Sequence, residues 1–285
     1  MTHDKRPSVA THPSLFNRTV LVTGGGRGIG RSFALALAAE GARVAICGRD
    51  ANTLAATAEQ LKEKGARAVL GVTGDVSQPD DCSRIVDRVA QTFGGLEVLV
   101  NNAGLGMRVV NEAFTTQPIP FWQADRQAWR SIIDANVLGP FYMSHTAAPL
   151  MVAAGFGRLI NVSTSPVTMV RRGYSPYGPS KSALEAMTRV WAQDLAGTGV
   201  TANAILPGGA TDTDLIPGSG PGRRGSDGQL LPVTIMDSAL LWLASDASSG
   251  INGRRVVGKL WDPTLPFDEA AEKAMPPQQE LPSIL

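Results

Sequence analysis

The stretch RTVLVTGGGRGIG, residues 18–30, decides the fold of this chain. Its first part, 18–25, is a short β-branched run that ends in glycines, which is typical of a buried strand followed by a turn. The next stretch, RSFALALAAEG at 31–41, has helical propensity and stops at a glycine. A glycine turn between a strand and a helix presents free backbone N–H groups and a positive helix end, which suit a pyrophosphate.

Three glycines of TGGGRGIG (23–30) have separate tasks in such a turn. Gly24 permits the tight turn, Gly28 lets the backbone approach a pyrophosphate, and Gly30 allows the helix to pack closely on the strand. We therefore expect the following residues to contact a dinucleotide cofactor: Gly24, Arg27, Gly28, Ile29 and Gly30. The alternative is a glycine-rich turn without a ligand.

Strand-like and helical stretches alternate along the rest of the chain. Further strands are predicted at 43–48, 66–76, 96–104, 157–165 and 200–209, and helices at 51–65, 79–94, in a long region after 104, and near 180–196. Alternation at this spacing predicts right-handed βαβ units. The expected fold is therefore α/β: a single-domain, Rossmann-type, doubly wound parallel sheet with helices on both faces.

The chain is expected to divide into three segments. Residues 1–16 are polar, lack the apolar run of a secretion signal, and read as a flexible tail. Residues 17–261 form the dinucleotide-binding catalytic domain, and 262–285 a Pro-rich tail with at most one short helix. Within the domain, the Gly- and Pro-rich stretch 211–232 is predicted to be the substrate loop.

Composition excludes several classes of function. The net charge of +1 does not indicate the strongly basic surface that binds nucleic acid. Cys47 and Cys82 are too few for a disulfide framework and predict reduced thiols in a cytoplasmic protein. The three histidines form no metal-binding motif, so no metal is expected. The most apolar stretch, 136–155, contains a histidine and two prolines, which argues against a membrane span.

Two further motifs follow predicted strands: NNAG at 101–104, and Tyr177-x-x-x-Lys181 within YSPYGPSK. Together with the T-G-x-x-x-G-x-G spacing they resemble the short-chain dehydrogenase/reductase family, from about Asn17 to about Trp261. The resemblance implies a nicotinamide cofactor and hydride transfer between a carbonyl and an alcohol carbon. It also implies further cofactor contacts by Asp75 and Val76 at the adenine, Asn102, Ala103 and Gly104 in the central turn, and Pro207 and Gly208 on the nicotinamide side.

Hydride transfer needs a group that gives or takes the hydroxyl proton. A tyrosine is a poor base at neutral pH, but a lysine one helical turn away favours its phenolate. This is the physical case for Tyr177 as acid/base with Lys181 beside it. The resemblance implies that Lys181 also holds the nicotinamide ribose, and that both residues contact the cofactor. The residue four positions after Tyr174 is Gly178, so Tyr174 has no cation at the spacing that Lys181 has from Tyr177.

The resemblance implies two more catalytic groups. A hydroxyl is expected thirteen residues before the tyrosine, which gives Thr164; Ser165 is a close second, and Ser163 stays open. Asn136 matches an asparagine whose main-chain carbonyl holds a relay water. Locally, Pro140 has no N–H to offer that carbonyl, so it is expected to be free for water.

The end of the second strand, ICGRD, bears on which nicotinamide cofactor binds. Gly48 stands where NAD-preferring relatives carry an acid, and Arg49 follows it. With Arg27 nearby, these guanidinium groups suit a 2′-phosphate and favour NADP(H) over NAD(H). Asp50 is the counter-argument, because a shift of one residue would make it a ribose ligand.

We therefore expect an NADP(H)-dependent oxidoreductase that interconverts a ketone or aldehyde and an alcohol. Its partner is a small-molecule carbonyl or alcohol, and analogy of fold suggests a homodimer or homotetramer through the helices in 136–155 and 180–196. The pocket is expected to be lined by Met107, Met169, Tyr174 and Leu215. The alternatives are a non-catalytic NAD(P)-sensing protein, and an epimerase or dehydratase with the same site chemistry.

Overall fold

A computed structural model describes residues 14–218, 223–225 and 228–277 of the chain. Its centre is one parallel sheet with the strand order β3-β2-β1-β4-β5-β6-β7. The strands are β1 (Thr19–Thr23), β2 (Arg43–Gly48), β3 (Ala68–Thr73), β4 (Val98–Asn101), β5 (Gly157–Val162), β6 (Val200–Leu206) and β7 (Arg255–Val257). The order reverses between β1 and β4, which makes this a doubly wound sheet with its switch point there.

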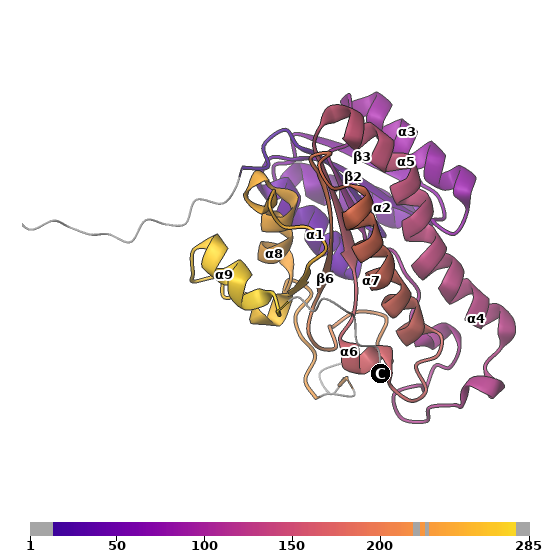
Figure 1. Cartoon of the computed structure of the whole chain (residues 1–285). Helices are drawn as coiled ribbons and strands as arrows, with labels where there is room; N and C mark the ends of the chain where they lie inside the picture. Colours follow the sequence, from indigo (N-terminus) through magenta and orange to yellow (C-terminus); the bar gives the residue numbers. More distant parts are fainter. Residues whose placement is uncertain (1–13, 219–222, 226–227, 278–285) are drawn as a thin grey trace, which may run out of the picture.

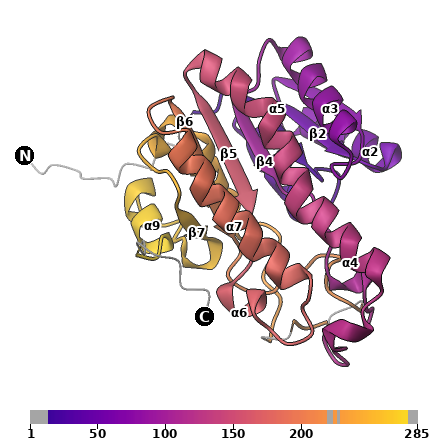
Figure 2. The ribbon, with the colours of Figure 1, turned by 45° about the vertical axis from the view of Figure 1, so that its right-hand side comes forward.

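Helices cover both faces of the sheet (Figures 1 and 2). The α-helices are α1 (Gly28–Ala39), α2 (Ala51–Glu63), α3 (Pro79–Phe93), α4 (Arg126–Ile133), α5 (Gly139–Ala154), α6 (Pro166–Met169), α7 (Tyr177–Asp194), α8 (Asp237–Ala244) and α9 (Phe267–Ala274). Short turns of helix are η1 (Met107–Val109), η2 (Phe121–Gln123), η3 (Asp134–Leu138, a π-helix), η4 (Asp246–Ser248) and η5 (Gly258–Leu260).

Alternate residues of β1 pack into two separate cores. Val20 and Val22 face the core that includes Phe33 of α1 and the buried residues of α8 and α9. Leu21 faces the other core, which contains apolar residues of α3 and α5. Because both faces are covered, every residue of β1 is buried, as expected of a central parallel strand. The structure thus confirms the predicted fold class.

Both ends of the described chain pack on the domain. Residues 1–13 of the predicted N-terminal tail lie outside the described residues, but Leu15 is fully buried in the core. The predicted C-terminal tail is ordered into the fold as far as residue 277: α9 buries Ala270, Ala271 and Ala274, and the Phe267 ring packs on Trp261. Burial of this apolar face is favourable, so α9 packs as part of the fold.

The sequence does not predict the edge strand β7, the helix α8 or the short helix α6. The described residues include no helix that is long and apolar enough to span a membrane, and no cluster of side chains suited to a metal ion. Cys47 and Cys82 are both free and buried. Burial raises the pKa of each thiol to about 12, so neither is a reactive thiolate at neutral pH.

Candidate active site

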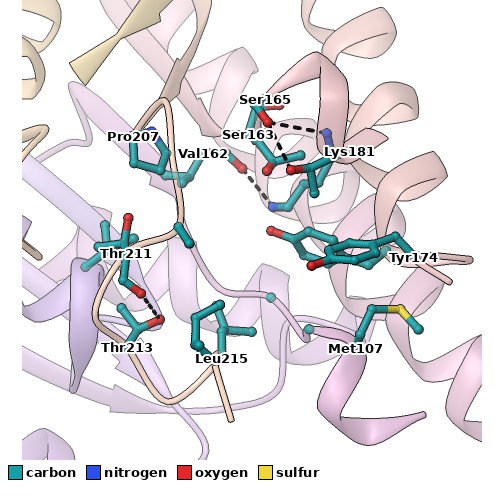
Figure 3. Close-up of a pocket in the computed structure, with 18 of the residues that line it drawn as sticks. Met107, Val162, Ser163, Ser165, Tyr174, Lys181, Pro207, Thr211, Thr213 and Leu215 are labelled. Carbon is teal, nitrogen blue, oxygen red and sulfur yellow. Dashed lines mark hydrogen bonds between the residues drawn. The ribbon is translucent and has the colours of Figure 1, made fainter. Parts of the chain in front are cut away.

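A cleft opens at the carboxyl ends of β4, β5 and β6 (Figure 3). This is where ligands bind in open α/β sheets. Eight of the residues predicted from the sequence to act in catalysis or cofactor binding line it: Ile29, Asn102, Gly104, Thr164, Ser165, Tyr177, Lys181 and Pro207. The cleft therefore joins the glycine turn, the central turn and the tyrosine–lysine helix in one place.

The glycine turn has the geometry that a pyrophosphate requires. Gly24 and Gly28 have φ of +64° and +52°, a backbone region that favours glycine. A Cβ on Gly30 would overlap the Gly24 carbonyl oxygen, so α1 packs directly on the turn. The N-cap residue of α1, Arg27, makes no side-chain cap, and the first turn of the helix has no acid. These features fit an anionic dinucleotide phosphate at the helix end.

The central turn after β4 is fastened to the glycine turn. The Thr23 hydroxyl accepts hydrogen bonds from the backbone N–H groups of Asn102 at 3.0 Å and Ala103 at 2.9 Å. The Asn102 side-chain amide in turn donates to the Thr23 carbonyl at 2.9 Å. The two turns that would border a cofactor are thereby held in fixed positions across the switch point.

Tyr177 is the first residue of α7 and lies in the wall of the cleft. The helix start is fixed by Gly178, on which a Cβ would overlap the carbonyl oxygen of Met169 in α6. Burial raises the pKa of the Tyr177 phenol to about 12, and a side-chain hydrogen bond with Thr164 opposes this shift. Burial has the larger effect on this pKa, because a buried phenolate is costly, and that Lys181 makes the phenol acidic stays a prediction.

Lys181 lies one turn along α7, and its side chain is buried. Its Nζ donates a hydrogen bond to the Val162 carbonyl at the end of β5, at 2.7 Å (Figure 3). Burial lowers the pKa of Lys181 to about 8, against an attraction to Glu185 that raises it. The ammonium is therefore the major form below about pH 8, and it is lost as the pH rises through that value.

The three hydroxyls after β5 have different partners. Ser163 Oγ donates to the Glu185 carboxylate at 2.6 Å, and Ser165 Oγ caps α6 and lies 2.9 Å from Thr168 Oγ1. Thr164 is hydrogen-bonded to Tyr177 in the cleft. Among the three alternatives, the geometry favours Thr164 as the hydroxyl that would meet a substrate oxygen beside the phenol.

Replacing Thr164 with valine is expected to lower kcat/KM by about 10- to 100-fold, since one hydrogen bond to the reacting oxygen is lost. Threonine to serine at the same position keeps the hydroxyl and is expected to stay within about threefold of the wild type. The measurement is steady-state kinetics with a saturating cofactor, with Ser165→Ala as the neighbouring control. A larger loss in Ser165→Ala than in Thr164→Val would transfer the role to Ser165.

Asn136 is fully buried in the π-helix η3. Its Oδ1 accepts from Leu105 N at 2.8 Å, and its Nδ2 donates to Leu105 O at 3.0 Å and to Ser180 Oγ at 3.1 Å. The side chain thus ties the segment after the central turn to α7 beside Lys181. The π-turn lies directly before Pro140, where the missing N–H interrupts the regular helix. That the Asn136 carbonyl holds a relay water stays a prediction.

The side chains that bear on the choice between NADP(H) and NAD(H) do not line the cleft itself. Asp50 caps α2, accepting from Thr53 N at 2.6 Å, so its carboxylate already has a structural task. Arg49 lies 3.8 Å from Asp75, and Arg27 lies 3.5 Å from Asp214. Both guanidinium groups are mostly exposed and paired only at the surface, which leaves them accessible to a phosphate.

The wall opposite the glycine turn is apolar. Met107, Tyr174 and Leu215 line it as predicted (Figure 3), whereas Met169 is not among the residues that do. Sequence reasoning missed Phe114, whose ring meets Tyr174 edge-on at 5.4 Å between centroids. It also missed Glu185. Phe114 follows no motif, and only its packing in the folded chain reveals it.

Comparisons with known proteins agree with this geometry. The family model described as short chain dehydrogenase matches residues 18–221. A short-chain type dehydrogenase/reductase of Picea abies is 36% identical over 201 residues, covering 68% of this chain and 71% of that protein. An oxidoreductase of Staphylococcus saprophyticus is 30% identical over 238 residues, which cover 84% of this chain and 96% of that protein.

Solved structures give the same answer. A short-chain type dehydrogenase/reductase from Mycobacterium ulcerans superposes with a TM-score of 0.74 at 32% identity, over 86% of this chain and 88% of that one. A structure described as a putative short-chain alcohol dehydrogenase from Sinorhizobium meliloti superposes with a TM-score of 0.73 at 29% identity. The match covers 86% of this chain and 96% of that one. By its sequence, its fold and the arrangement of its cleft, the chain belongs to the short-chain dehydrogenase/reductase family.

Proposed function

We propose that this oxidoreductase is an NADP(H)-dependent carbonyl reductase or alcohol dehydrogenase that acts on uncharged substrates. The observation that carries the proposal is the hydrogen-bonded pair of Thr164 and Tyr177, buried in one cleft with Lys181 and opposite the glycine turn. A protonated phenol and a second hydroxyl at one point suit a carbonyl oxygen that becomes an alcohol.

Each residue has a role in this proposal. Tyr177 is protonated at neutral pH, since its pKa is about 12, and so it can donate a proton to the substrate oxygen during reduction. Thr164 orients that oxygen, and the ammonium of Lys181 stabilises the phenolate that remains. The nicotinamide supplies or accepts the hydride when it is bound. Arg27, Arg49, the glycine turn and the central turn would hold the cofactor.

The lining of the cleft supports an uncharged, largely apolar substrate. Among the described residues that line it, none is acidic, and Lys181 is the only cation. Leu105, Met107, Phe114, Leu215 and Ile216 supply apolar surface around the two hydroxyls. A carboxylate or phosphate on the substrate would find no second cation here, and its desolvation would be unfavourable.

A panel of carbonyl compounds tests the proposal, with NADPH oxidation followed by absorbance. Uncharged cyclic and aryl ketones are expected to be reduced with at least about tenfold higher kcat/KM than 2-oxo acids of similar size. Tight NADPH binding with no oxidation over a broad panel would instead favour a non-catalytic sensor.

The preference for NADP(H) over NAD(H) rests on the end of β2. Gly48 offers no carboxylate to the ribose, Asp50 is committed to capping α2, and Arg49 is free to turn toward a 2′-phosphate. Arg49→Gln is expected to lower kcat/KM for NADPH by about 10-fold or more and to leave NADH almost unaffected, since a charge-assisted hydrogen bond is lost.

The control for this prediction is Arg130→Gln, which removes another mostly exposed guanidinium, paired with Asp134, from α4. Arg130→Gln is expected to leave kcat/KM unchanged for both NADPH and NADH. A loss of the same size for both cofactors in Arg49→Gln would show that this arginine does not read the 2′-phosphate.

Assembly through α5 and α7 is also part of the proposal. Phe141, Leu150 and Val152 of α5 and Val190 of α7 are between 39% and 53% exposed. Exposed apolar side chains on neighbouring helices favour burial against a second copy of the chain.

A further inference from the structure

Glu185 lies one turn beyond Lys181 on α7, and its carboxylate is largely buried, with 14% of the side chain exposed. Ser163 Oγ donates to Oε1 at 2.6 Å. Arg255 Nε donates to Oε2 at 2.9 Å and to Oε1 at 3.1 Å, and its Nη2 also donates to Oε2. Both oxygens of this carboxylate are therefore engaged, and the side chain is fixed.

One partner of Glu185 lies next to the residue that holds Lys181, and the other lies on the edge strand of the sheet. Ser163 directly follows Val162, whose carbonyl accepts the Lys181 Nζ hydrogen bond at 2.7 Å. Arg255 is the first residue of β7, the strand that pairs with β6 at the edge of the sheet. The Glu185–Arg255 ion pair therefore lies one helical turn from Lys181, and Ser163 links it to the strand end that holds the Lys181 ammonium.

We propose that Glu185, oriented by Arg255 and Ser163, is a positioning residue that keeps Lys181 in its ammonium form beneath the substrate cleft. The proposal deepens the proposed function and rests on it. Glu185 lines no part of the cleft as described and acts only through Lys181. Its negative charge attracts the ammonium, and the Arg255 guanidinium limits how strongly it does so.

Other charged groups around Lys181 are few. Its own helix contributes Tyr177 four residues before it and Glu185 four residues after it, and Tyr174 lies near Tyr177. The strand β6 and the helix α6 carry no ionisable side chain, and Arg158 of β5 lies at the opposite end of its strand. Asp134 of η3 is paired with Arg130 at 3.4 Å. The Glu185–Arg255 pair is therefore the main charged neighbour of the lysine.

This arrangement predicts opposite effects for the two partners. Glu185→Gln leaves the Arg255 cation uncompensated, which disfavours a second cation nearby, so Lys181 should lose its proton at lower pH. Arg255→Met leaves the Glu185 carboxylate unpaired, which favours the ammonium, so the proton should be lost at higher pH. Each shift is expected to be about one pH unit from the wild-type midpoint near 8.

Carbon-13 NMR of lysine ε-methylene groups in the ligand-free protein measures this midpoint directly. The chain has six lysines, and Lys181→Met identifies the resonance of Lys181. The matched control is Asp194→Asn, which removes a carboxylate from the exposed end of the same helix and should leave the midpoint within about 0.2 units. The double variant Glu185→Gln/Arg255→Met is expected to return the midpoint toward that of the wild type.

The same variants are then followed through the pH profile of turnover, which should shift in the same direction as the NMR midpoint. Circular dichroism confirms that each variant is folded. Equal midpoints in all variants, or shifts of the same sign for Glu185→Gln and Arg255→Met, would overturn the proposal. If no variant turns over any substrate but the midpoints move as expected, the proposed function fails and the coupling of Glu185 to Lys181 stands.

Discussion

Replacing Tyr177 with phenylalanine is expected to lower kcat for carbonyl reduction by about 10²- to 10⁴-fold. The phenylalanine ring fills the same space at the start of α7, so the cleft keeps its shape, but no proton donor remains beside Thr164. The dissociation constant for NADPH should change by less than about threefold, because the ring still packs in place. Stopped-flow absorbance and fluorescence titration measure the two quantities.

Tyr174→Phe is the matched control for this prediction. Tyr174 also lines the cleft and also loses only a hydroxyl, but Gly178 rather than a lysine stands four residues further along. Its kcat is expected to stay within about tenfold of the wild type. If Tyr174→Phe proves the more damaging change, the acid has been assigned to the wrong tyrosine.

Replacing Gly30 with alanine is expected to have the second largest effect. The added Cβ would overlap the Gly24 carbonyl oxygen and lie 2.5 Å from Asn102 Nδ2, and the first of these atoms belongs to the backbone and cannot turn away. Overpacking of this kind costs about 1–3 kcal/mol of folding free energy. Moving α1 off the glycine turn should also raise the dissociation constant for NADPH by at least about tenfold.

Gly250→Ala serves as the control, because a Cβ there meets nothing within 4 Å. Chemical denaturation and isothermal titration of NADPH are run on both variants. An unchanged NADPH affinity in a folded Gly30→Ala protein would show that the glycine turn does not hold the cofactor phosphates.

The sequence allowed the fold and most of the cleft to be predicted because their signals are local. Each of the first six strands is a short apolar run closed by a turn, and each motif lies at the carboxyl end of a strand, where parallel strands bring distant residues together. Topology thus places Tyr177, Lys181 and the hydroxyls after β5 at one edge of the sheet, whereas the choice of Thr164 among those hydroxyls was implied by the family resemblance.

Features that depend on tertiary contacts could not be predicted from the sequence. The strand β7 has only three residues and follows Arg254, so no alternation marks it. The choice among Ser163, Thr164 and Ser165 depends on which of them Glu185 and α6 engage. Glu185 itself depends on Arg255, seventy residues away in the chain.

The acidity of the phenol depends on tertiary contacts in the same way. The spacing of Tyr177 and Lys181 indicates the attraction between a phenolate and an ammonium, but it does not indicate how far both groups are buried. Burial raises the pKa of Tyr177 to about 12 and lowers that of Lys181 to about 8, so each neutral form is favoured. How deeply two residues of a helix are buried depends on the surrounding fold and not on their spacing.

Isotope transfer tests the central claim most directly. The protein is incubated with an uncharged ketone and NADPH that carries deuterium at the transferable position of the nicotinamide, and the product alcohol is analysed by mass spectrometry. The account predicts one deuterium on the carbinol carbon, formed by the wild type and at a rate lower by about 10²-fold or more in Tyr177→Phe. An alcohol without deuterium, or equal rates for the two proteins, would contradict it.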